Sequence, residues 1–216
     1  ADVLQALGVN VEIAPEQVSA CLQEAGIGFL FAPMLHGAMK HAIGPRKEIG
    51  TRTVFNILGP LTNPAGAKRQ LLGVFDRSLT QKMAAVLRTL DSERAFVVHG
   101  EDGLDEITIS GQTTVTELDG GELSTYELGP ADLGFENAPA SELAGGDAEE
   151  NAKILTGVLE GQSGPKKDVV IMNGAAAIAA GGLAPSIADG VVLAEESISS
   201  GRAMATLDKL REVSNR

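Results

Sequence analysis

Residues 70–98 have the sequence QLLGVFDRSLTQKMAAVLRTLDSERAFVV, and this stretch decides the expected fold. It consists of an apolar run of strand length at 70–75, an amphipathic stretch at 79–90 and a second apolar run at 94–98. In the middle part, leucine, methionine and valine recur at the spacing of one helix face. A strand, a helix and a strand in this order are typical of neighbouring parallel strands in an α/β sheet.

A hairpin and further helices are expected outside this stretch. Residues 113–118 and 123–128 flank Asp119-Gly120-Gly121, which favours an antiparallel hairpin. Ser78 and Asp147 each stand three residues before a Gln or Glu, so we expect both to cap helices. The other expected helices cover 1–8, 15–25, 168–180 and 202–213. We therefore predict an α/β fold with a mixed, largely parallel sheet flanked by helices.

Composition excludes several classes of protein. The 216 residues include 29 Asp and Glu against 17 Lys and Arg, which gives a net charge of −12. A protein that binds nucleic acid or a membrane surface would carry the opposite excess, so we expect neither partner. Cys21 alone cannot form an internal disulfide, which favours a cytoplasmic compartment. The longest apolar stretch, 169–185, contains Asn173 and is too short for a membrane span.

Charge is distributed unevenly along the chain. Residues 40–90 carry a balance of +7, whereas residues 91–150 carry −15. A basic block inside an acidic protein indicates a local site for a small anion. Two solvated faces would explain the same distribution.

The first group of candidate residues follows an apolar run at 27–31, which we expect to form a strand. The strand would end at Pro33 and lead to His36, with Arg46 ten residues further on. Small-molecule sites in open α/β sheets favour this carboxyl edge. Arg46 offers a two-pronged donor for a carboxylate or phosphate. A helix-capping histidine and a surface arginine would explain the same residues.

A rigid loop is expected next, at the end of a short apolar helix. Gly59, Pro60 and Pro64 force a bend there. Such a loop can form one wall of a pocket for a flat ligand, and an ordinary helix stop is the alternative.

The third group follows the apolar strand at 94–98. After His99-Gly100, a glycine-containing turn presents Asp105 and Glu106. Carboxylate oxygens of this kind suit Mg²⁺, which uses one or two of them together with phosphates and water. A solvated acidic turn is the alternative. His99 is expected to have a structural role at the strand end.

Together, these motifs resemble the anthranilate phosphoribosyltransferase family. They are His36-Gly-Ala-Met-Lys40, the run from Arg46 to Pro64, and Gly103-Leu-Asp105-Glu106. Asn173-Gly-Ala-Ala-Ala also fits in order and spacing, and the resemblance covers essentially the whole chain. It implies a small helical domain and a larger α/β domain of the nucleoside phosphorylase and phosphoribosyltransferase type, with the active site between them.

The resemblance also implies an activity and roles for particular residues. The family transfers a phosphoribosyl group from phosphoribosyl diphosphate to the amine of anthranilate, in tryptophan biosynthesis, and the intact enzyme is expected to be a homodimer. Arg46 would contact the anthranilate carboxylate, and Asp105 and Glu106 would hold Mg²⁺. The path of anthranilate would be lined by His36, Gly59 and Pro60. No covalent nucleophile is expected.

Two departures from the family pattern stand out. Gly37 occupies a position where the family usually has proline, and no Gly-x-Gly-Gly-Asp motif for diphosphate occurs in the 216 residues. We therefore expect residues 1–216 to be the α/β domain of the transferase, truncated at its front and inactive alone. Residues 32–66 would pack against the helical domain.

Two other functions remain as alternatives. The first is a pyrimidine nucleoside phosphorylase-like enzyme, which would have no need of a metal pair at Asp105 and Glu106. Mg²⁺ dependence would separate it from the transferase. The second is a non-enzymatic relative that binds nucleic acid, which salt-sensitive DNA binding would reveal.

Overall fold

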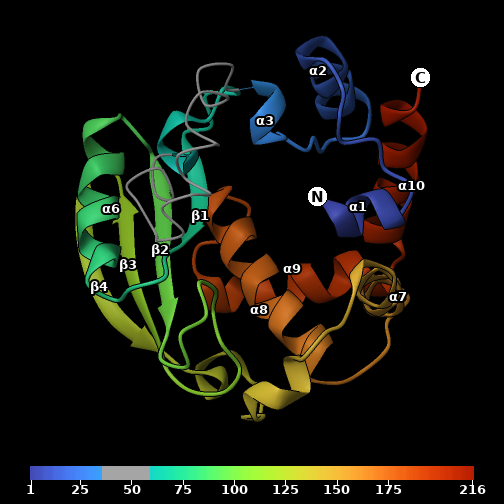
Figure 1. Ribbon diagram of the computed structural model, residues 1–216. Coiled ribbons are helices and arrows are strands. Elements are labelled where there is room, and N and C mark those ends of the chain that lie inside the picture. Colours follow the sequence, from blue (N-terminus) through green and yellow to red (C-terminus); the bar gives the residue numbers. More distant parts are fainter. Residues whose placement is uncertain (36–58) are drawn as a thin grey trace, which may run out of the picture. The chain divides into compact units, whose positions relative to one another are not determined.

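The computed structural model describes residues 1–35 and 59–216, and the chain divides into two compact units (Figure 1). Unit 1 comprises Ala1–Gly59, Gly145–Gly161 and Ile198–Arg216. Unit 2 comprises Pro60–Ala144 and Gln162–Ser197. The expectation that residues 32–66 pack against a further helical domain stays a prediction, since most of this segment lies outside the described residues.

Unit 1 is built from helices. They are α1 (Asp2–Ala6), α2 (Pro15–Glu24), α3 (Ala32–Leu35), α7 (Ala148–Leu159) and α10 (Arg202–Ser214). α2 packs against α10, and α1 packs against α7. Proline at the first position of α2 suits a helix start. A backbone N–H at this position would have no partner within the helix, so nothing is lost when proline lacks it. Buried residues such as Val11, Cys21 and Val213 form the core of this unit.

Residues 27–31 form no strand, contrary to the prediction. The rings of Phe29 and Phe31 stack with centroids 6.1 Å apart. Both rings, together with Leu30, pack against the core of unit 1. The apolar run therefore buries its side chains against helices, which a run of five residues can do as well as it can form a strand. The argument that placed the following polar residues at a sheet edge does not hold.

Unit 2 contains a four-stranded sheet in the order β1-β2-β3-β4. The strands are β1 (Arg69–Gly73), β2 (Arg94–Gly100), β3 (Thr113–Asp119) and β4 (Glu122–Leu128). β1 and β2 are parallel, with Leu71 opposite Phe96, as residues 70–98 predicted. β2 pairs with β3, and β3 with β4, in antiparallel fashion.

The mixed sheet flanked by helices is confirmed, but the prediction that it is largely parallel is wrong for the described strands. One of the three described pairings is parallel. The reason is that the chain reverses twice after β2, first in the loop at 101–112 and then at Gly120-Gly121. Both glycines have positive φ angles, 56° and 92°, as a two-residue turn of type I′ requires.

Helices cover the sheet of unit 2. α6 (Leu79–Thr89) joins β1 to β2 and packs against β2, β3 and β4, while α8 (Pro165–Ala180) packs against β1 and β2. Figure 1 shows α6 and α8 on opposite sides of the sheet. Residues 95–98 of β2 are accordingly all buried. α9 (Ile187–Ser199) packs closely on α8, because a Cβ atom at Gly190 would lie 2.5 Å from the Ala175 carbonyl oxygen.

Short elements complete the described residues. Three 3₁₀ helices are present among them, namely η2 (Gly59–Thr62), η3 (Pro130–Leu133) and η4 (Ala140–Leu143). Asp147 caps α7 as predicted, with its carboxylate accepting from the Glu150 amide at 2.9 Å. The predicted Ser78 cap is wrong, since the Ser78 side chain makes no cap bond to α6. Within residues 1–35 and 59–216, no helix combines the length and apolar character that crossing a membrane requires.

A largely buried ion pair anchors β2 to its surroundings. The Arg94 guanidinium donates to the Glu117 carboxylate at 2.9 Å, and it lies 5.2 Å from the centre of the Phe96 ring. The other Glu117 oxygen accepts from the Tyr126 hydroxyl at 3.3 Å. Arg94 also donates to three carbonyl groups at the end of α8 and beyond it, those of Ala179, Ala184 and Pro185. Every charged group in this cluster therefore has partners, as burial demands.

Candidate functional site

The loop at 101–112 presents Asp105 and Glu106 beyond the carboxyl end of β2. Three residues that follow the pair, Ile107, Thr108 and Ile109, have none of their surface exposed. The Gly100 amide also donates to the Leu104 carbonyl at 2.9 Å. The pair therefore stands on a backbone held from both sides, although its side chains reach solvent.

Asp102 organises the first half of this loop. Its carboxylate accepts from the hydroxyls of Thr108, at 2.6 Å, and Ser110, and from the Leu104 amide at 3.2 Å. Partial burial alone would raise the pKa of Asp102, but these hydrogen bonds outweigh it and lower the pKa. Asp102 is therefore a structural carboxylate, with its oxygens committed to the loop.

Asp105 and Glu106 are exposed, as Asp102 is, but their carboxylates have no partner among the described residues. Among the described residues, no hydrogen bond or ion pair engages either carboxylate. Loss of hydration around Glu106 raises its pKa, and the neighbouring Asp105 carboxylate raises it further. A cation bound between the two would relieve this repulsion. The pair is therefore suited to a divalent cation.

The chemistry of the two carboxylates is compatible with Mg²⁺. The described residues contain no group of three or more His, Cys, Asp and Glu side chains that could hold a metal ion. Mg²⁺ needs no such cage, because it is usually held by one or two carboxylates plus phosphate oxygens and water. Two adjacent hard carboxylates on a fixed loop fit this pattern.

Two residues that contact this loop were missed as functional residues. Asn173 of α8 hydrogen-bonds the backbone of Ile107, and Gly73 of β1 lies directly against the Asp105 carbonyl. Asn173 appeared in the sequence only as part of a family motif. The signal was its position, a single amide within the apolar stretch 169–185, because a buried amide needs partners.

His99 has the structural role that was expected of it. It is half-buried near the end of β2, and its Nδ1 lies 2.8 Å from the Val74 carbonyl oxygen. Since a carbonyl oxygen only accepts, this nitrogen carries the proton. The bond ties the ends of β1 and β2 together.

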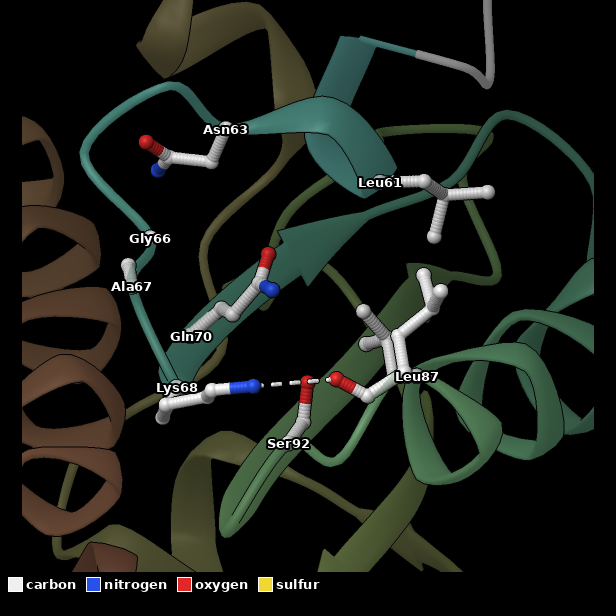
Figure 2. A pocket seen from close by; sticks show the side chains of 9 residues that line it. Leu61, Asn63, Gly66, Ala67, Lys68, Gln70, Leu87 and Ser92 are labelled. Carbon is white, nitrogen blue, oxygen red and sulfur yellow. Dashed lines mark hydrogen bonds between the residues drawn. The ribbon is translucent and has the colours of Figure 1, made fainter.

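A small pocket lies at the opposite, amino ends of β1 and β2 (Figure 2). Its volume is about 200 Å³, below the roughly 300–1,000 Å³ of typical ligand sites. The Lys68 ammonium, the one cation among the described lining residues, donates to the Leu90 carbonyl at 3.2 Å.

The remaining predicted site residues are less fully placed. His36 and Arg46 lie outside the described residues. Gly59 and Pro60 begin η2, and Leu61 lines the pocket beside Lys68, which precedes β1. The roles of His36, Arg46, Gly59 and Pro60 stay predictions.

Comparison with known proteins decides the family. The model of the glycosyl transferase family, α/β domain, matches residues 1–204. The chain belongs to this glycosyl transferase family. Among curated proteins, an anthranilate phosphoribosyltransferase from Acetivibrio thermocellus is 53% identical over 215 residues, which is 100% of this chain and 62% of that protein. One from Rhodopseudomonas palustris is 55% identical over 99% of this chain and 63% of that protein. This glycosyl transferase chain thus spans somewhat less than two thirds of these relatives.

Solved structures of the glycosyl transferase family agree with the fold. The crystal structure of anthranilate phosphoribosyltransferase from Thermus thermophilus matches with a TM-score of 0.92 and 41% identity, over 100% of this chain and 64% of that chain. The enzyme from Saccharomyces cerevisiae in complex with phosphoribosyl diphosphate and Mg matches with a TM-score of 0.89 and 32% identity, over 99% of this chain and 62% of that chain.

Proposed function

We propose that this chain takes part in the transfer of a phosphoribosyl group from phosphoribosyl diphosphate to the amine of anthranilate, with release of diphosphate. The observation that carries the proposal is its identity of 53% and 55% to anthranilate phosphoribosyltransferases over 100% and 99% of its length. These relatives favour the transferase over the two alternatives, nucleoside phosphorolysis and nucleic-acid binding.

The acidic pair fits the charge that develops in this reaction. Breaking the bond between ribose C1 and oxygen builds negative charge on the leaving diphosphate. A bound Mg²⁺ would supply positive charge that stabilises this group. Asp105 and Glu106 would hold the ion and leave the rest of its shell to phosphate and water. A yeast relative solved with phosphoribosyl diphosphate and Mg supports this assignment.

The proposal gives the other predicted residues the task of placing anthranilate. Arg46 would bind its carboxylate, and its path would be lined by His36, Gly59 and Pro60. The anthranilate amine is already neutral at pH 7, so no strong general base is required. Holding this amine against C1 is the main demand on the site.

We also infer a setting and an assembly. The lone buried Cys21 supports a reducing, cytoplasmic compartment. A homodimer rests on the family resemblance.

The first test changes the acidic pair. Asp105→Asn is combined with Glu106→Gln in the protein at the full length that its gene encodes. We expect Mg²⁺-dependent binding of phosphoribosyl diphosphate, measured by calorimetry, and turnover, measured by loss of anthranilate fluorescence, to be abolished. The matched control is Glu149→Gln with Glu150→Gln, an exposed adjacent pair in α7. An unchanged Mg²⁺ titration in the acidic-pair variant would contradict the metal role.

The second test concerns Arg46. Arg46→Ala should raise the KM for anthranilate about tenfold to a hundredfold, because it removes one charge-assisted contact. Binding of phosphoribosyl diphosphate should stay nearly unchanged. Equal damage to both substrates would count against the assignment.

A further inference from the structure

Asn173 makes the most complete hydrogen-bonding contact with the loop that carries the acidic pair. Its side-chain oxygen accepts from the Ile107 amide at 2.9 Å, and its side-chain nitrogen donates to the Ile107 carbonyl at 2.9 Å. The same nitrogen donates to the Val169 carbonyl, one turn earlier in α8, at 2.9 Å. One side chain thus grips both backbone groups of the residue that follows Glu106.

These contacts determine how the amide is oriented. The Ile107 N–H can only donate and its carbonyl can only accept. The side-chain amide of Asn173 therefore has one possible orientation, because a flip that exchanged its oxygen and nitrogen would lose both hydrogen bonds. The bond to Val169 holds the side chain against its own helix. Because asparagine is a poor helix former, its presence inside α8 is explained by the contact it makes rather than by helix stability.

Gly73 limits the same loop from the side of β1. A Cβ atom at this position would lie 1.6 Å from the Asp105 carbonyl oxygen and 2.6 Å from its carbonyl carbon. Any other residue would displace the backbone of Asp105. β1 therefore restrains the backbone of Asp105 by close approach, and α8 restrains the backbone of Ile107 by paired hydrogen bonds.

We propose that Asn173 is a positioning residue for the metal site, which acts with Gly73 to set the direction in which Asp105 and Glu106 present their carboxylates. The proposal rests on the proposed function of the acidic pair. Residues that hydrogen-bond to metal ligands and fix their orientation affect metal affinity strongly. Their substitution typically lowers metal affinity or activity about tenfold to a hundredfold. Asn173 acts through the backbone of the residue next to Glu106.

The chain offers a matched control for this clamp. The Asn151 side chain, in α7, contacts Gly146 in the loop before this helix. It accepts from the Gly146 amide at 3.0 Å and donates to the Gly146 carbonyl at 2.9 Å. This is the same paired contact, made to a loop of unit 1 rather than to the acidic loop of unit 2. Asn151→Ala therefore removes an equivalent clamp without touching the proposed metal site.

The experiment compares Asn173→Ala with Asn151→Ala at the full length that the gene encodes. Amide hydrogen exchange follows the order of the loop, and calorimetry gives the Mg²⁺ concentration that half-saturates binding of phosphoribosyl diphosphate. We expect Asn173→Ala to speed exchange at Ile107 and to raise this concentration about tenfold to a hundredfold. Asn151→Ala should leave both unchanged. Gly73→Ala, which leaves the amide clamp in place, should also raise the Mg²⁺ requirement. Asn173→Asp, which keeps the acceptor for the Ile107 amide but loses the donor to the Ile107 carbonyl, decides the question if Asn173→Ala does not fold.

The outcomes separate the two proposals. If Asn173→Ala speeds exchange at Ile107 while the Mg²⁺ requirement stays at the wild-type value, Asn173 is only structural and the inference is wrong. Unchanged exchange at Ile107 would also overturn it. If the wild-type protein itself binds phosphoribosyl diphosphate without regard to Mg²⁺, the proposed metal role fails, and positioning fails with it.

Discussion

Unit 2 contains two groups of charged side chains that are built in opposite ways. In the Arg94 cluster, a guanidinium, a carboxylate and a phenol are largely buried, and each is hydrogen-bonded to the others or to backbone carbonyls. In the acidic pair, two like charges stand next to each other in solvent, with no described partner. The charged groups of the Arg94 cluster already have partners within the fold. The carboxylates of the acidic pair have no described partner, so their oxygens could still accept from or coordinate a ligand.

This difference shows how charged side chains that stabilise the fold can be distinguished from charged side chains that are available to bind a ligand. Both groups stand on well-held backbone, so rigidity does not distinguish them. What distinguishes them is whether the side-chain oxygens are committed. Asp102 makes the same point within the acidic loop itself, because its carboxylate is committed to Thr108 and Ser110 while Asp105, three residues later, has no described partner. Matched substitutions test this distinction through the free energy of unfolding.

The largest effect is expected for Arg94→Ala. It would leave Glu117 largely buried without its cation, and the free energy of unfolding should fall by about 3 kcal/mol. Urea denaturation followed by circular dichroism measures this. The control is Arg77→Ala, which breaks the exposed Arg77–Glu127 pair and should cost no more than about 1 kcal/mol. Similar losses for both variants would remove the distinction between the two kinds of pair.

The next effect concerns alkaline pH. Burial of Tyr126, followed by the charge of Glu117 and the hydrogen bond to it, raises the pKa of this phenol well above its ordinary value of 10. The folded state therefore holds the proton more tightly than the unfolded state does. The resulting stability is fully present below pH 10 and is lost as the pH rises through the folded pKa. The chain has one tyrosine and no tryptophan, so ultraviolet absorbance titrates Tyr126 alone.

The control for this titration is Glu117→Gln, which removes the nearby negative charge and should bring the pKa of Tyr126 closer to 10. A phenol that ionises at its ordinary pH in the folded wild-type protein would show that the cluster is open to solvent.

A smaller effect is expected for Asp102→Ala. The substitution leaves the hydroxyls of Thr108 and Ser110 and the Leu104 amide without their common acceptor. Because Asp102 is itself exposed, water replaces part of these contacts, and the loss should be about 1–2 kcal/mol. The same urea denaturation measures it. A loss within about 0.5 kcal/mol, the usual range of surface substitutions, would mean that Asp102 contributes little to holding the loop.

The smallest effect on stability is expected where the largest effect on function is proposed. Asp105→Asn combined with Glu106→Gln should change the free energy of unfolding by no more than about 0.5 kcal/mol, because neither carboxylate has a described partner to lose. A slight gain is the expected direction, since two like charges are removed. A loss as large as that of Arg94→Ala would make the pair structural.

The local parts of the fold could be predicted from the sequence, and the long-range parts could not. The β1–α6–β2 unit and the hairpin follow from patterns within about 30 residues, and both are confirmed. The apolar run at 27–31 is ambiguous in the sequence, because five apolar residues do not show whether they join a sheet or pack against helices. In the structure, they pack against the core of unit 1. Ser78 precedes α6 and has a helical ψ of −14°, whereas a capping residue is usually extended. Its hydroxyl therefore accepts no hydrogen bond from the first amides of α6.

The site shows the same division. Asp105 and Glu106 were identified from adjacent carboxylates in a turn, and the structure finds both exposed after β2. Asn173 and Ile107 are 66 positions apart in the sequence, so their contact could not be predicted from it. The only trace of this contact in the sequence is a polar side chain, Asn173, within an apolar stretch. Gly73 lies beside Asp105 for a reason that only the packed structure reveals.

The bond between Asn173 and Gly174 has a consequence for how the protein ages. Asparagine followed by glycine is prone to deamidation, because the glycine amide nitrogen can attack the side-chain carbonyl and expel ammonia. The succinimide that forms is then opened by water to aspartate or isoaspartate. In the folded chain the peptide is held within α8 and the side-chain oxygen is held by Ile107, so ring closure is blocked. Any time spent unfolded exposes the bond to this reaction, which puts a carboxylate where the amide stood. Material kept denatured for long before refolding should therefore accumulate this lesion in α8, at the contact with the acidic loop, where mass spectrometry can detect it.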